Sequence, residues 1–260
     1  MTDADLDRAL AAAVEAAGAA GEVAMRYYRT GFDVTMKADA TPVTEADRGA
    51  ERAIREVIGR AFPAHGFLGE EFGAVGDQTT RWIIDPIDGT RNYVRRIPMW
   101  AVMIGLEEDG EVTAGAIFQP VTGVLHTAWR GQGAYRDGER IRVSRVDALD
   151  RALLVHSSLN FLRRSKYWDG FLDLVDRTQV QRGFGDFSAY LWVAEGQGEI
   201  ALSTTVKAWD VAAIKAVVEE AGGRITDLDG STGIYGSTVF ASNGLLHDAA
   251  LAALRRERRA

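Results

Sequence analysis

Apolar residues recur at helical spacing in two segments near the start of the chain. Residues 4–28 are rich in strong helix formers, and apolar side chains follow one another at helical intervals, at Leu6, Leu10, Val14 and Ala17. A second helix is predicted from Thr44, because the Thr44 hydroxyl and the Asp47 carboxylate can accept hydrogen bonds from the free amides of a first turn. Pro63 and Gly66 end this second pattern.

Short apolar runs replace the helical pattern between residues 82 and 135, separated by turn-forming segments, which predicts an antiparallel sheet. After about Val146, strands and helices alternate. Strands are predicted at 153–156, near Val180 and at 239–241, and helices at 167–175, 188–196 and 208–221. We therefore expect an α+β N-terminal portion, residues 1–146, and an α/β C-terminal portion, residues 147–260. Because no Pro- or Ser-rich linker separates them, we expect the two portions to pack as one unit.

The composition limits the chemistry that the chain can support. The absence of cysteine excludes disulfides, thiolate nucleophiles and cysteine-ligated metals, so any metal must have oxygen or imidazole ligands. A formal net charge of −7 argues against a nucleic-acid partner, and the basic segment 255–259 is interpreted as a solvated helix end. The apolar stretches are too short to cross a bilayer and the N-terminal segment is acidic, so we expect a cytoplasmic protein with no membrane partner.

The densest group of reactive side chains follows the apolar run at 82–84. It consists of Asp85, Pro86, Ile87, Asp88, Gly89 and Thr90. Because proline restricts the preceding residue to extended backbone, we expect the strand to stop at Asp85 and both carboxylates to converge with the Ile87 carbonyl. A helix beginning after Gly89 would direct its free amides toward an anion beside a carboxylate-bound cation. The alternative is an ordinary junction in which Asp88 caps the following helix.

Further acidic residues stand where loops meet regular elements. Glu70 and Glu71 follow a short apolar run, and Gly69 before them allows another segment to approach closely. Alone, this glutamate pair is typical of a solvated turn. Asp210 opens an amphipathic helix that ends at Gly222, and alone it is typical of a helix N-cap.

Together, these acidic residues resemble the inositol monophosphatase superfamily of lithium-sensitive, magnesium-dependent phosphatases. The defining motifs of that superfamily end in GEE, DPIDGT and WD, and all three occur here in order, at 69–71, 85–90 and 209–210. The resemblance extends from Lys37 and the segment 42–47 to 242–244. It implies a layered α-β-α-β-α sandwich of the inositol monophosphatase and fructose-1,6-bisphosphatase type, usually assembled as a homodimer.

The resemblance also implies two to three Mg²⁺ ions in each active site. Their ligands would be Glu70, Asp85, the Ile87 carbonyl, Asp88, Asp210 and Asp47. Glu70, Asp85 and the Ile87 carbonyl would hold one ion. Asp85, Asp88 and Asp210 would hold a second, and Asp47 with Glu70 would help position a third.

The same resemblance implies that water, and no side chain, attacks the phosphate of a small-molecule monoester. The catalytic residues would be Glu70, Asp47, Thr90 and Asp85. Thr90 and Asp47 would orient and deprotonate the water, and the Gly89 and Thr90 amides would bind phosphate. Lys37 would lie on a mobile loop near the metals. Cations of this kind bind phosphate oxygens, acidify water and neutralise the leaving alkoxide.

The C-terminal portion carries the signals for the substrate. Residues 182–190 and 193–196 resemble the actinobacterial histidinol-phosphate phosphatases within the superfamily. Inositol phosphatases have a Gly-Ser/Thr-Ala run where this chain has residues 185–187, and the Asp186 carboxylate would suit a cationic amino alcohol better than a neutral polyol. The alternative is that Asp186 caps a helix at 187–195. Ser203 departs from the family pattern, which has a substrate-contacting glutamate at that position.

These observations predict hydrolysis of L-histidinol phosphate to L-histidinol and phosphate. Inositol 1-phosphate is the runner-up substrate, followed by other sugar or nucleotide phosphates. The residues expected to contact the substrate are Asp88, Gly89, Thr90, Arg182, Asp186 and Asp210.

Two other interpretations are set aside. The segment 225–232 nearly matches the DxDGT motif of aspartate-nucleophile phosphatases, but that motif normally opens its domain, and a surface turn after a strand is the better interpretation. Some relatives in this superfamily act as regulatory RNA-polymerase-binding proteins, so a binding module that retains the fold is an alternative. The intact residues Glu70, Asp85, Asp88, Thr90 and Asp210 argue against it.

Overall fold

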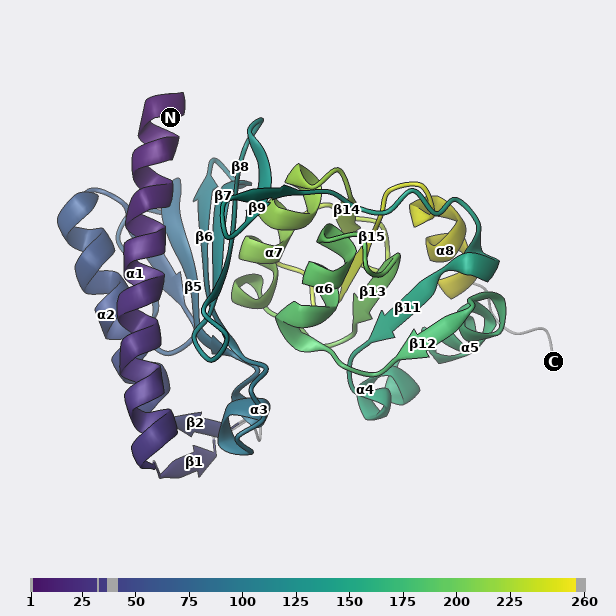
Figure 1. Ribbon diagram of the computed structural model, residues 1–260, viewed down its shortest axis with the longest axis horizontal. Coiled ribbons are helices and arrows are strands. Elements are labelled where there is room, and N and C mark those ends of the chain that lie inside the picture. Colours follow the sequence, from purple (N-terminus) through teal and green to yellow (C-terminus); the bar gives the residue numbers. More distant parts are fainter. Residues whose placement is uncertain (1, 32, 37–41, 256–260) are drawn as a thin grey trace.

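The computed structural model describes residues 2–31, 33–36 and 42–255, and within them helices and sheets alternate in layers (Figure 1). The first layer contains α1 (Asp3–Thr30) and α2 (Glu45–Ala61), and the central layer contains α6 (Asp186–Ala194) and α7 (Ala208–Glu220). The last layer contains α4 (Leu159–Arg164), α5 (Trp168–Arg177) and α8 (His247–Leu254). One sheet lies on each side of the central layer. The predicted α-β-α-β-α sandwich is therefore confirmed.

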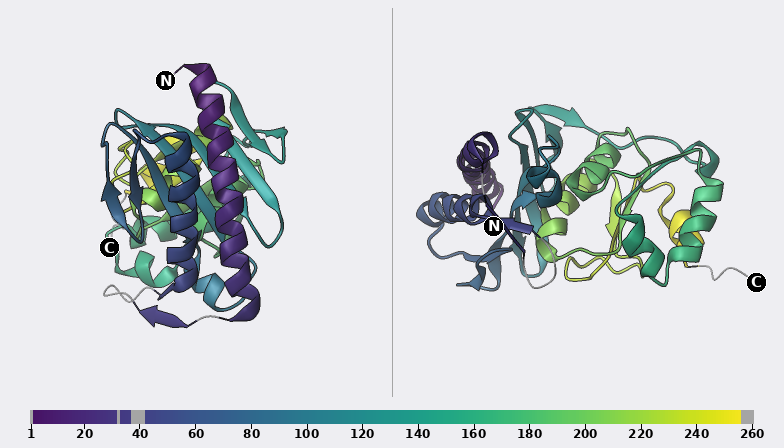
Figure 2. Two further views of the ribbon diagram at one scale, coloured as in Figure 1. Left: turned by 90° about the vertical axis from the view of Figure 1, so that its left-hand side faces the viewer. Right: turned by 90° about the horizontal axis from the view of Figure 1, so that it is seen from below.

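The two predicted N-terminal helices form and pack side by side on the outer face of the larger sheet (Figure 2). The apolar stripe of α1 is buried between α2 and this sheet. At the start of α2, the Thr44 hydroxyl accepts a hydrogen bond from the Ala46 amide at 3.1 Å, and Asp47 accepts one from the Thr44 amide at 2.7 Å. This is the predicted cap. A short ribbon of β1 (Val34–Met36) and β2 (Pro42–Thr44) precedes it.

The larger sheet has eight strands in the order β10-β9-β8-β7-β6-β5-β3-β4. The strands are β3 (Gly66–Gly69), β4 (Gly73–Val75), β5 (Thr80–Asp88), β6 (Ala101–Glu108), β7 (Glu111–Gln119), β8 (Val124–Trp129), β9 (Gly133–Arg136) and β10 (Glu139–Ile141). Neighbouring strands are antiparallel except for β3 and β5, which run parallel. The antiparallel sheet predicted for residues 82–135 is confirmed.

The predicted end of the first strand at Asp85 is wrong. The strand β5 continues to Asp88, and its register with β6 shifts: Asp85 pairs with Met103, whereas Asp88 pairs with Ala101. One extra residue on β5 therefore forms a bulge that contains Pro86. A bulge tolerates proline because the residues within it need not donate to the neighbouring strand. The consequence is that both aspartates remain attached to the sheet.

The smaller sheet has five strands in the order β12-β11-β13-β15-β14. Its strands are β11 (Leu153–His156), β12 (Val180–Arg182), β13 (Ile200–Ser203), β14 (Arg224–Thr226) and β15 (Val239–Ser242). The strand β11 runs parallel to β12 and β13, and β15 runs antiparallel to β13 and β14. The strands predicted at 153–156, near Val180 and at 239–241 are present. The division of the chain near Val146 into two portions stays a prediction.

Two glycines allow α7 to lie directly on the larger sheet. Gly105 on β6 and Gly115 on β7 are paired across the strands. A Cβ atom at Gly105 would lie 2.7 Å from the Cβ of Ala212, and one at Gly115 would lie 2.7 Å from the Ala213 carbonyl oxygen. A larger side chain at either position would push the helix outward. The close approach therefore fixes how α7 is placed over β6 and β7.

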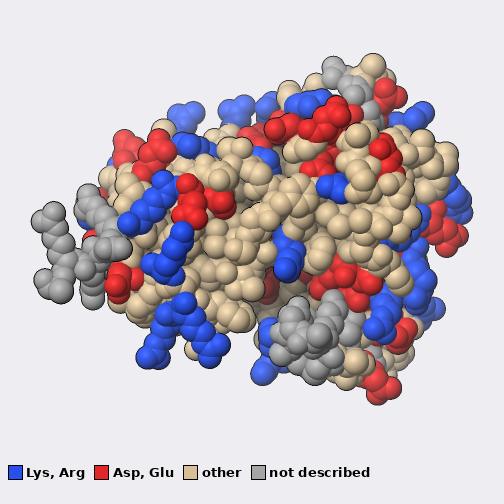
Figure 3. Space-filling model, turned by 180° about the vertical axis from the view of Figure 1, so that it is seen from behind, with Lys and Arg blue, Asp and Glu red and all other residues tan. Residues whose placement is uncertain are grey.

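The surface shows acidic and basic side chains interspersed on the face in Figure 3, in keeping with the net charge of −7. In the part of the chain that the structure describes, no helix combines the length and the apolar character needed to cross a bilayer.

Candidate active site

Three carboxyl groups meet where β5 ends and α7 begins. Oxygen atoms of Asp85, Asp88 and Asp210 all lie within 4.8 Å of one another, and no other such group of metal-ligand side chains occurs among the described residues. Asp85 and Asp88 are 2% and 8% exposed. The β5 bulge supplies two of these groups, and the first turn of α7 supplies the third. The predicted convergence of the first two aspartates, joined by Asp210, is therefore observed.

Backbone amides orient each of the three carboxyl groups. Asp85 accepts a hydrogen bond from the Ile87 amide at 3.0 Å, and Asp210 accepts one from the Lys207 amide at 2.7 Å. Asp88 accepts one from the Phe187 amide at 2.6 Å. The alternative that Asp88 caps the helix after it is wrong, because this carboxylate caps α6, which lies far along the chain. Asp210 accepts a hydrogen bond from the amide of the residue that precedes α7. It therefore caps α7, as the alternative predicted, and also belongs to the cluster.

Burial and mutual repulsion disfavour the charged forms of these groups. Burial raises the pKa of Asp85 well above its usual range, and the charges of Glu70, Asp88 and Asp210 raise it further. Burial likewise raises the pKa of Asp88, with contributions from the charges of Asp186 and Asp210. Burial raises the pKa of Asp210 to about 7. A set of crowded carboxylate oxygens suits a hard divalent cation, which would replace repulsion by attraction.

Glu70 lies beside this cluster. Its amide donates to the Ile84 carbonyl at 3.2 Å, which places it next to the strand that leads into Asp85. The charge of Glu70 contributes to the raised pKa of both Asp85 and Asp210. Among the described residues, Glu70 does not belong to the three carboxylates whose oxygen atoms lie within 4.8 Å of one another. It therefore lies at the edge of the site.

Asp47 lies in the first turn of α2, and Thr90 is the first residue of α3. Both the amide and the hydroxyl of Thr44 donate to Asp47 at 2.7 Å. Burial raises the pKa of Asp47 to about 7, and the charges of Glu71 and Glu70 add to the effect. Thr90 donates its hydroxyl hydrogen to the Ile87 carbonyl at 3.0 Å. The side chain of Thr90 is therefore tied to a carbonyl that the sequence predicts as a metal ligand.

Gly89 makes the tight turn between the bulge and the next helix. Its φ of 84° is left-handed, and α3 (Thr90–Val94) begins directly after it, as predicted. A Cβ atom at this position would lie 3.0 Å from the Met99 carbonyl oxygen and 3.5 Å from Oδ2 of Asp186. Glycine is required here both by backbone conformation and by these close neighbours.

Asp186 stands at the start of α6 in a left-handed conformation, with φ of 57°. The alternative that it caps this helix is wrong, because no side-chain cap bond is present and Asp88 binds the Phe187 amide instead. Asp186 accepts a hydrogen bond from the Asn92 side chain at 3.0 Å. Partial desolvation raises the pKa of Asp186, whereas Arg91 and Asn92 oppose the increase. The residue as a whole is exposed.

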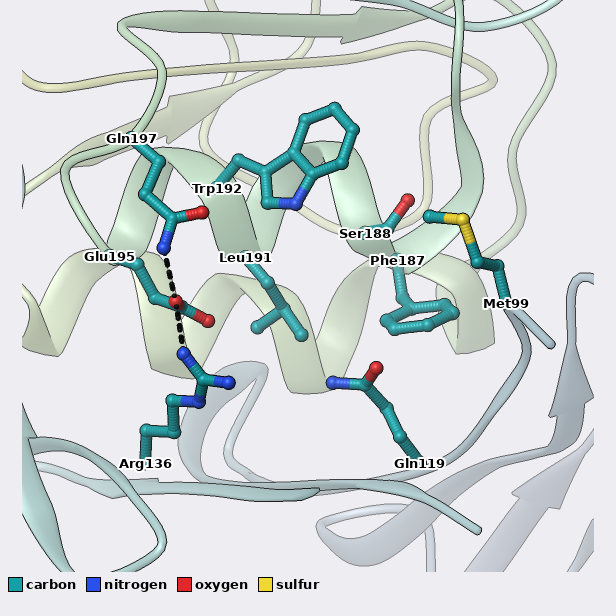
Figure 4. Close-up of a pocket in the computed structure, with 9 residues that line it drawn as sticks. All are labelled: Met99, Gln119, Arg136, Phe187, Ser188, Leu191, Trp192, Glu195 and Gln197. Carbon is teal, nitrogen blue, oxygen red and sulfur yellow. Dashed lines mark hydrogen bonds and ion pairs between the residues drawn. The ribbon is translucent and has the colours of Figure 1, made fainter. Parts of the chain in front are cut away.

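A cavity of about 200 Å³ opens along α6 (Figure 4). It is lined by Met99, Gln119, Arg136, Phe187, Ser188, Leu191, Trp192, Glu195 and Gln197. At its far end, Glu195 accepts hydrogen bonds from Arg136 at 3.0 Å and from Gln197 at 2.9 Å. Near the cluster, the Met99 carbonyl accepts from Asn92. The cavity offers space for part of a small organic molecule.

The sequence matches the inositol monophosphatase family over residues 5–259. The chain belongs to the inositol monophosphatase family. It is a phosphoric monoester hydrolase. The histidinol-phosphatase of Mycobacterium tuberculosis is 44% identical over 236 residues, which cover 88% of this chain and 91% of that protein. The inositol-1-monophosphatase of Caulobacter vibrioides is 36% identical over 236 residues, covering 87% and 92%. The crystal structure of extragenic suppressor protein suhB from Bartonella henselae superposes with a TM-score of 0.89 at 32% identity, covering 95% and 98%.

Some residues that the sequence predicts in the active site do not belong to the carboxylate cluster. Arg182 is exposed and donates to the Gln181 carbonyl at 2.8 Å, so no described contact joins it to the carboxylates. Lys37 lies outside the described residues. The DxDGT-like segment forms a surface turn after β14, in which Asp227 accepts from the amides of Asp229 and Ser231. The aspartate-nucleophile interpretation therefore stays rejected.

Several residues near the site were missed by sequence reasoning. Asn92 links Asp186 to the Met99 carbonyl, and its only sequence signal was its position two residues after Thr90. The hydroxyl of Tyr190 is buried beside Ser203, the residue that departs from the family pattern. Burial raises the pKa of Tyr190, which keeps the hydroxyl protonated. The hydroxyl groups of Tyr190 and Ser203 are therefore neutral hydrogen-bonding groups close to the carboxylates.

Proposed function

We propose that the protein is a Mg²⁺-dependent phosphatase that hydrolyses L-histidinol phosphate to L-histidinol and inorganic phosphate. The observation that carries the proposal is the group of three carboxyl groups within 4.8 Å of one another, with the Asp186 carboxyl group next to them. The similarity to the histidinol-phosphatase of M. tuberculosis supports the choice of substrate. The proposal includes a cytoplasmic homodimer that lithium inhibits, as the family resemblance implies.

The proposed ligands of Mg²⁺ are Glu70, Asp85, the Ile87 carbonyl, Asp88, Asp210 and Asp47. When bound, the ions would polarise the phosphate, lower the pKa of a water molecule and neutralise the leaving oxygen. The crowded carboxyl groups fit this role, because burial and then the neighbouring negative charges raise their pKa values, and a divalent cation would offset both effects.

The remaining site residues would bind phosphate and move a proton. The amides of Gly89 and Thr90 lie at the start of α3 and would donate to phosphate oxygens. Asp47, held by two hydrogen bonds from Thr44, would accept a proton from the attacking water. A pKa of about 7 suits a proton acceptor that works near neutral pH. Thr90 would orient the water through its oxygen, since its hydrogen is donated to Ile87.

Asp186 would recognise the ammonium group of histidinol phosphate. Asn92 holds the carboxylate by a 3.0 Å hydrogen bond, and Asp186 is exposed, so a charged partner could bind there. A carboxylate bonded to an ammonium group favours a cationic ligand over a neutral one. The adjacent cavity along α6 would accommodate the rest of the substrate.

The decisive experiment measures phosphate release from L-histidinol phosphate and from inositol 1-phosphate in parallel, with Mg²⁺ and with EDTA. The proposal expects Mg²⁺-dependent release with a clear preference for histidinol phosphate. Equal release after chelation would contradict the metal requirement. Activity on neither ester would overturn this choice of substrates and point to another small phosphate monoester.

Inositol 1-phosphate is the second candidate substrate. The buried Tyr190 hydroxyl and Ser203 offer neutral hydrogen-bonding groups near the carboxylates, and such groups suit a polyol. The similarity to the inositol-1-monophosphatase of C. vibrioides supports the same choice. A preference for inositol 1-phosphate in the parallel assay would select this candidate.

A further inference from the structure

Glu51 is a charged side chain that is 0% exposed and that the proposed reaction does not use. It lies on α2 one helical turn after Asp47. Its Oε1 accepts a hydrogen bond from Nε of Arg55 at 2.8 Å, and Arg55 NH2 also lies 2.8 Å from Oε1. Its Oε2 accepts a hydrogen bond from the Glu71 amide at 2.8 Å. Glu51 therefore joins α2 to the turn that carries Glu70.

Glu51 and Arg55 together hold both ends of that turn. The Glu51 carboxylate lies over Gly69, where a Cβ atom would be 1.9 Å from Oε1. Arg55 NH2 donates to the Gly73 carbonyl at 2.8 Å, and Gly69 and Gly73 are paired between β3 and β4. The glycine of the GEE motif is therefore explained by the carboxylate that occupies the space where its side chain would stand.

The backbone on both sides of Glu70 is fixed as a result. The Glu70 amide donates to the Ile84 carbonyl, and the next amide, that of Glu71, donates to Glu51. Ile84 directly precedes Asp85, so the first bond ties Glu70 to the strand that supplies the carboxylate cluster. The second bond ties the turn that follows β3 to α2. Together the two bonds anchor the peptide groups on both sides of Glu70.

A buried ion pair seldom stabilises a fold more than apolar side chains of similar size would. The positions of Glu51 and Arg55 indicate a role other than stabilising the fold. We propose that these two side chains are positioning residues that hold Glu70 where it can bind a divalent cation together with Asp85. This inference rests on the proposed metal-dependent function. Partners that orient a metal ligand typically change metal affinity by about 10- to 100-fold when they are removed.

The test measures Mg²⁺ affinity by calorimetry without substrate, on the full chain. Glu51→Gln retains the size of the side chain over Gly69 but removes the charge that holds Arg55. We expect a Kd for Mg²⁺ that is about 10- to 100-fold higher than in the wild type. Hydrogen exchange at the Glu71 amide should become faster in the metal-free variant, because its acceptor is weakened. Glu56→Gln is the matched control, since Glu56 lies on α2 and its side chain is 72% exposed.

The outcomes separate this inference from the proposed function. Unchanged Mg²⁺ affinity and unchanged exchange at Glu71 in Glu51→Gln would overturn the positioning role. Absence of Mg²⁺ binding to the wild type would instead overturn the proposed function, and the positioning role with it. If Glu51→Gln does not fold, Arg55→Lys provides the same measurement, because lysine keeps the charge but cannot bridge Glu51 and Gly73. Wild-type affinity in that variant would contradict the inference.

Discussion

Asp85 is buried in a bulge and shares its surroundings with three other acidic side chains. Asn at this position would keep an oxygen that accepts from the Ile87 amide but would remove a charge proposed to contact two cations. We expect Asp85→Asn to abolish Mg²⁺-dependent phosphate release. The metal-free variant should also have a higher free energy of unfolding than the metal-free wild type near neutral pH, because one source of repulsion is gone. Phosphate assays and urea denaturation measure the two effects.

The control for this change is Asp109→Asn, because Asp109 is exposed in the turn between β6 and β7 and asparagine tolerates its φ of 51°. This variant should behave as the wild type in both assays. Retained activity in Asp85→Asn would disprove the assignment of Asp85 as a metal ligand.

Asp186→Asn removes the charge of this side chain and changes little else. Asparagine also adopts the left-handed backbone of this position and can accept a hydrogen bond from Asn92. Asp186→Asn should lower kcat/KM for histidinol phosphate by roughly tenfold or more, in line with the loss of a charged hydrogen bond. Release from inositol 1-phosphate should change much less. Steady-state kinetics on both esters, with the exposed Asp169→Asn on α5 as control, measure the difference. An equal loss on both esters would contradict a role in recognising the ammonium group.

At the scale of single residues, the sequence predicted the acidic cluster but not its partners. Asp85 and Asp88 stand close together in a motif, and Asp210 belongs to a second motif, so the family pattern identified all three. Asn92 and Glu51 belong to no such motif, and their partners Asp186 and Glu71 lie far away along the chain. Contacts of this kind become visible only when the fold brings the segments together.

At the scale of elements, local signals located α1, α2 and most of the strands. The end of β5 was misplaced because proline stops a strand by local rules, whereas pairing with β6 carries the strand through the bulge. The helix α8 and the strand β13 were not predicted. The former is short and largely apolar, and the latter has four buried residues, so neither shows the alternation that marks an amphipathic element.

The close packing of α7 on the sheet leads to a prediction about Gly115. A Cβ atom there would lie 2.7 Å from a backbone oxygen of α7, which cannot move independently of the helix. Gly115→Ala should therefore lower the free energy of unfolding by about 1–3 kcal/mol. Because α7 carries Asp210, Mg²⁺ affinity should fall as well. Urea denaturation and calorimetry measure the two effects.

Gly59→Ala on α2 is the control for this substitution, since nothing lies within 4 Å of a Cβ atom at that position. This alanine should stabilise the protein by up to about 1 kcal/mol, because alanine is the better helix former. A Gly115→Ala protein with wild-type stability and Mg²⁺ affinity would show that the contact with α7 relaxes without displacing Asp210.

At the scale of the whole molecule, the order of the layers followed from the family resemblance and not from periodicity. Alternating apolar runs predicted strands, but they could not assign β3 and β4 to the edge beside β5 or distribute the strands between two sheets. That distribution depends on which faces α6 and α7 cover. Long-range packing of this kind has no signature in a short window of sequence.

The stability of the metal-free protein should decrease as the pH rises through about 7. Asp47 and Asp210 have pKa values of about 7, and those of Asp85 and Asp88 are also raised, so the folded protein retains protons that the unfolded chain has already released. Such groups stabilise the fold at lower pH and lose this contribution as the pH passes their folded-state pKa. Burial lowers the pKa of His247 to about 4, so this group makes the fold more stable as the pH rises. Its contribution to the free energy of unfolding is complete only above about pH 6.5.

Thermal unfolding between about pH 6.5 and 8.5, in EDTA and in excess Mg²⁺, tests this expectation. The unfolding temperature in EDTA should fall across the interval, and the stabilisation by Mg²⁺ should be larger at the upper end. A metal-free unfolding temperature that rises with pH would contradict the proposed protonation of the cluster.

The hydrogen bond from the Phe187 amide to Asp88, and the arrival of Asp210 at the same cluster, also bear on synthesis at the ribosome. A nascent chain exposes Asp85 and Asp88 long before α6 and α7 have been translated. Until residue 187 has left the exit tunnel, Asp88 lacks the amide that it binds in the finished fold, and until residue 210 has left it, both carboxylates lack the third acidic group. Products of premature termination before α7 therefore cannot assemble the three-carboxylate cluster on which the proposed activity depends.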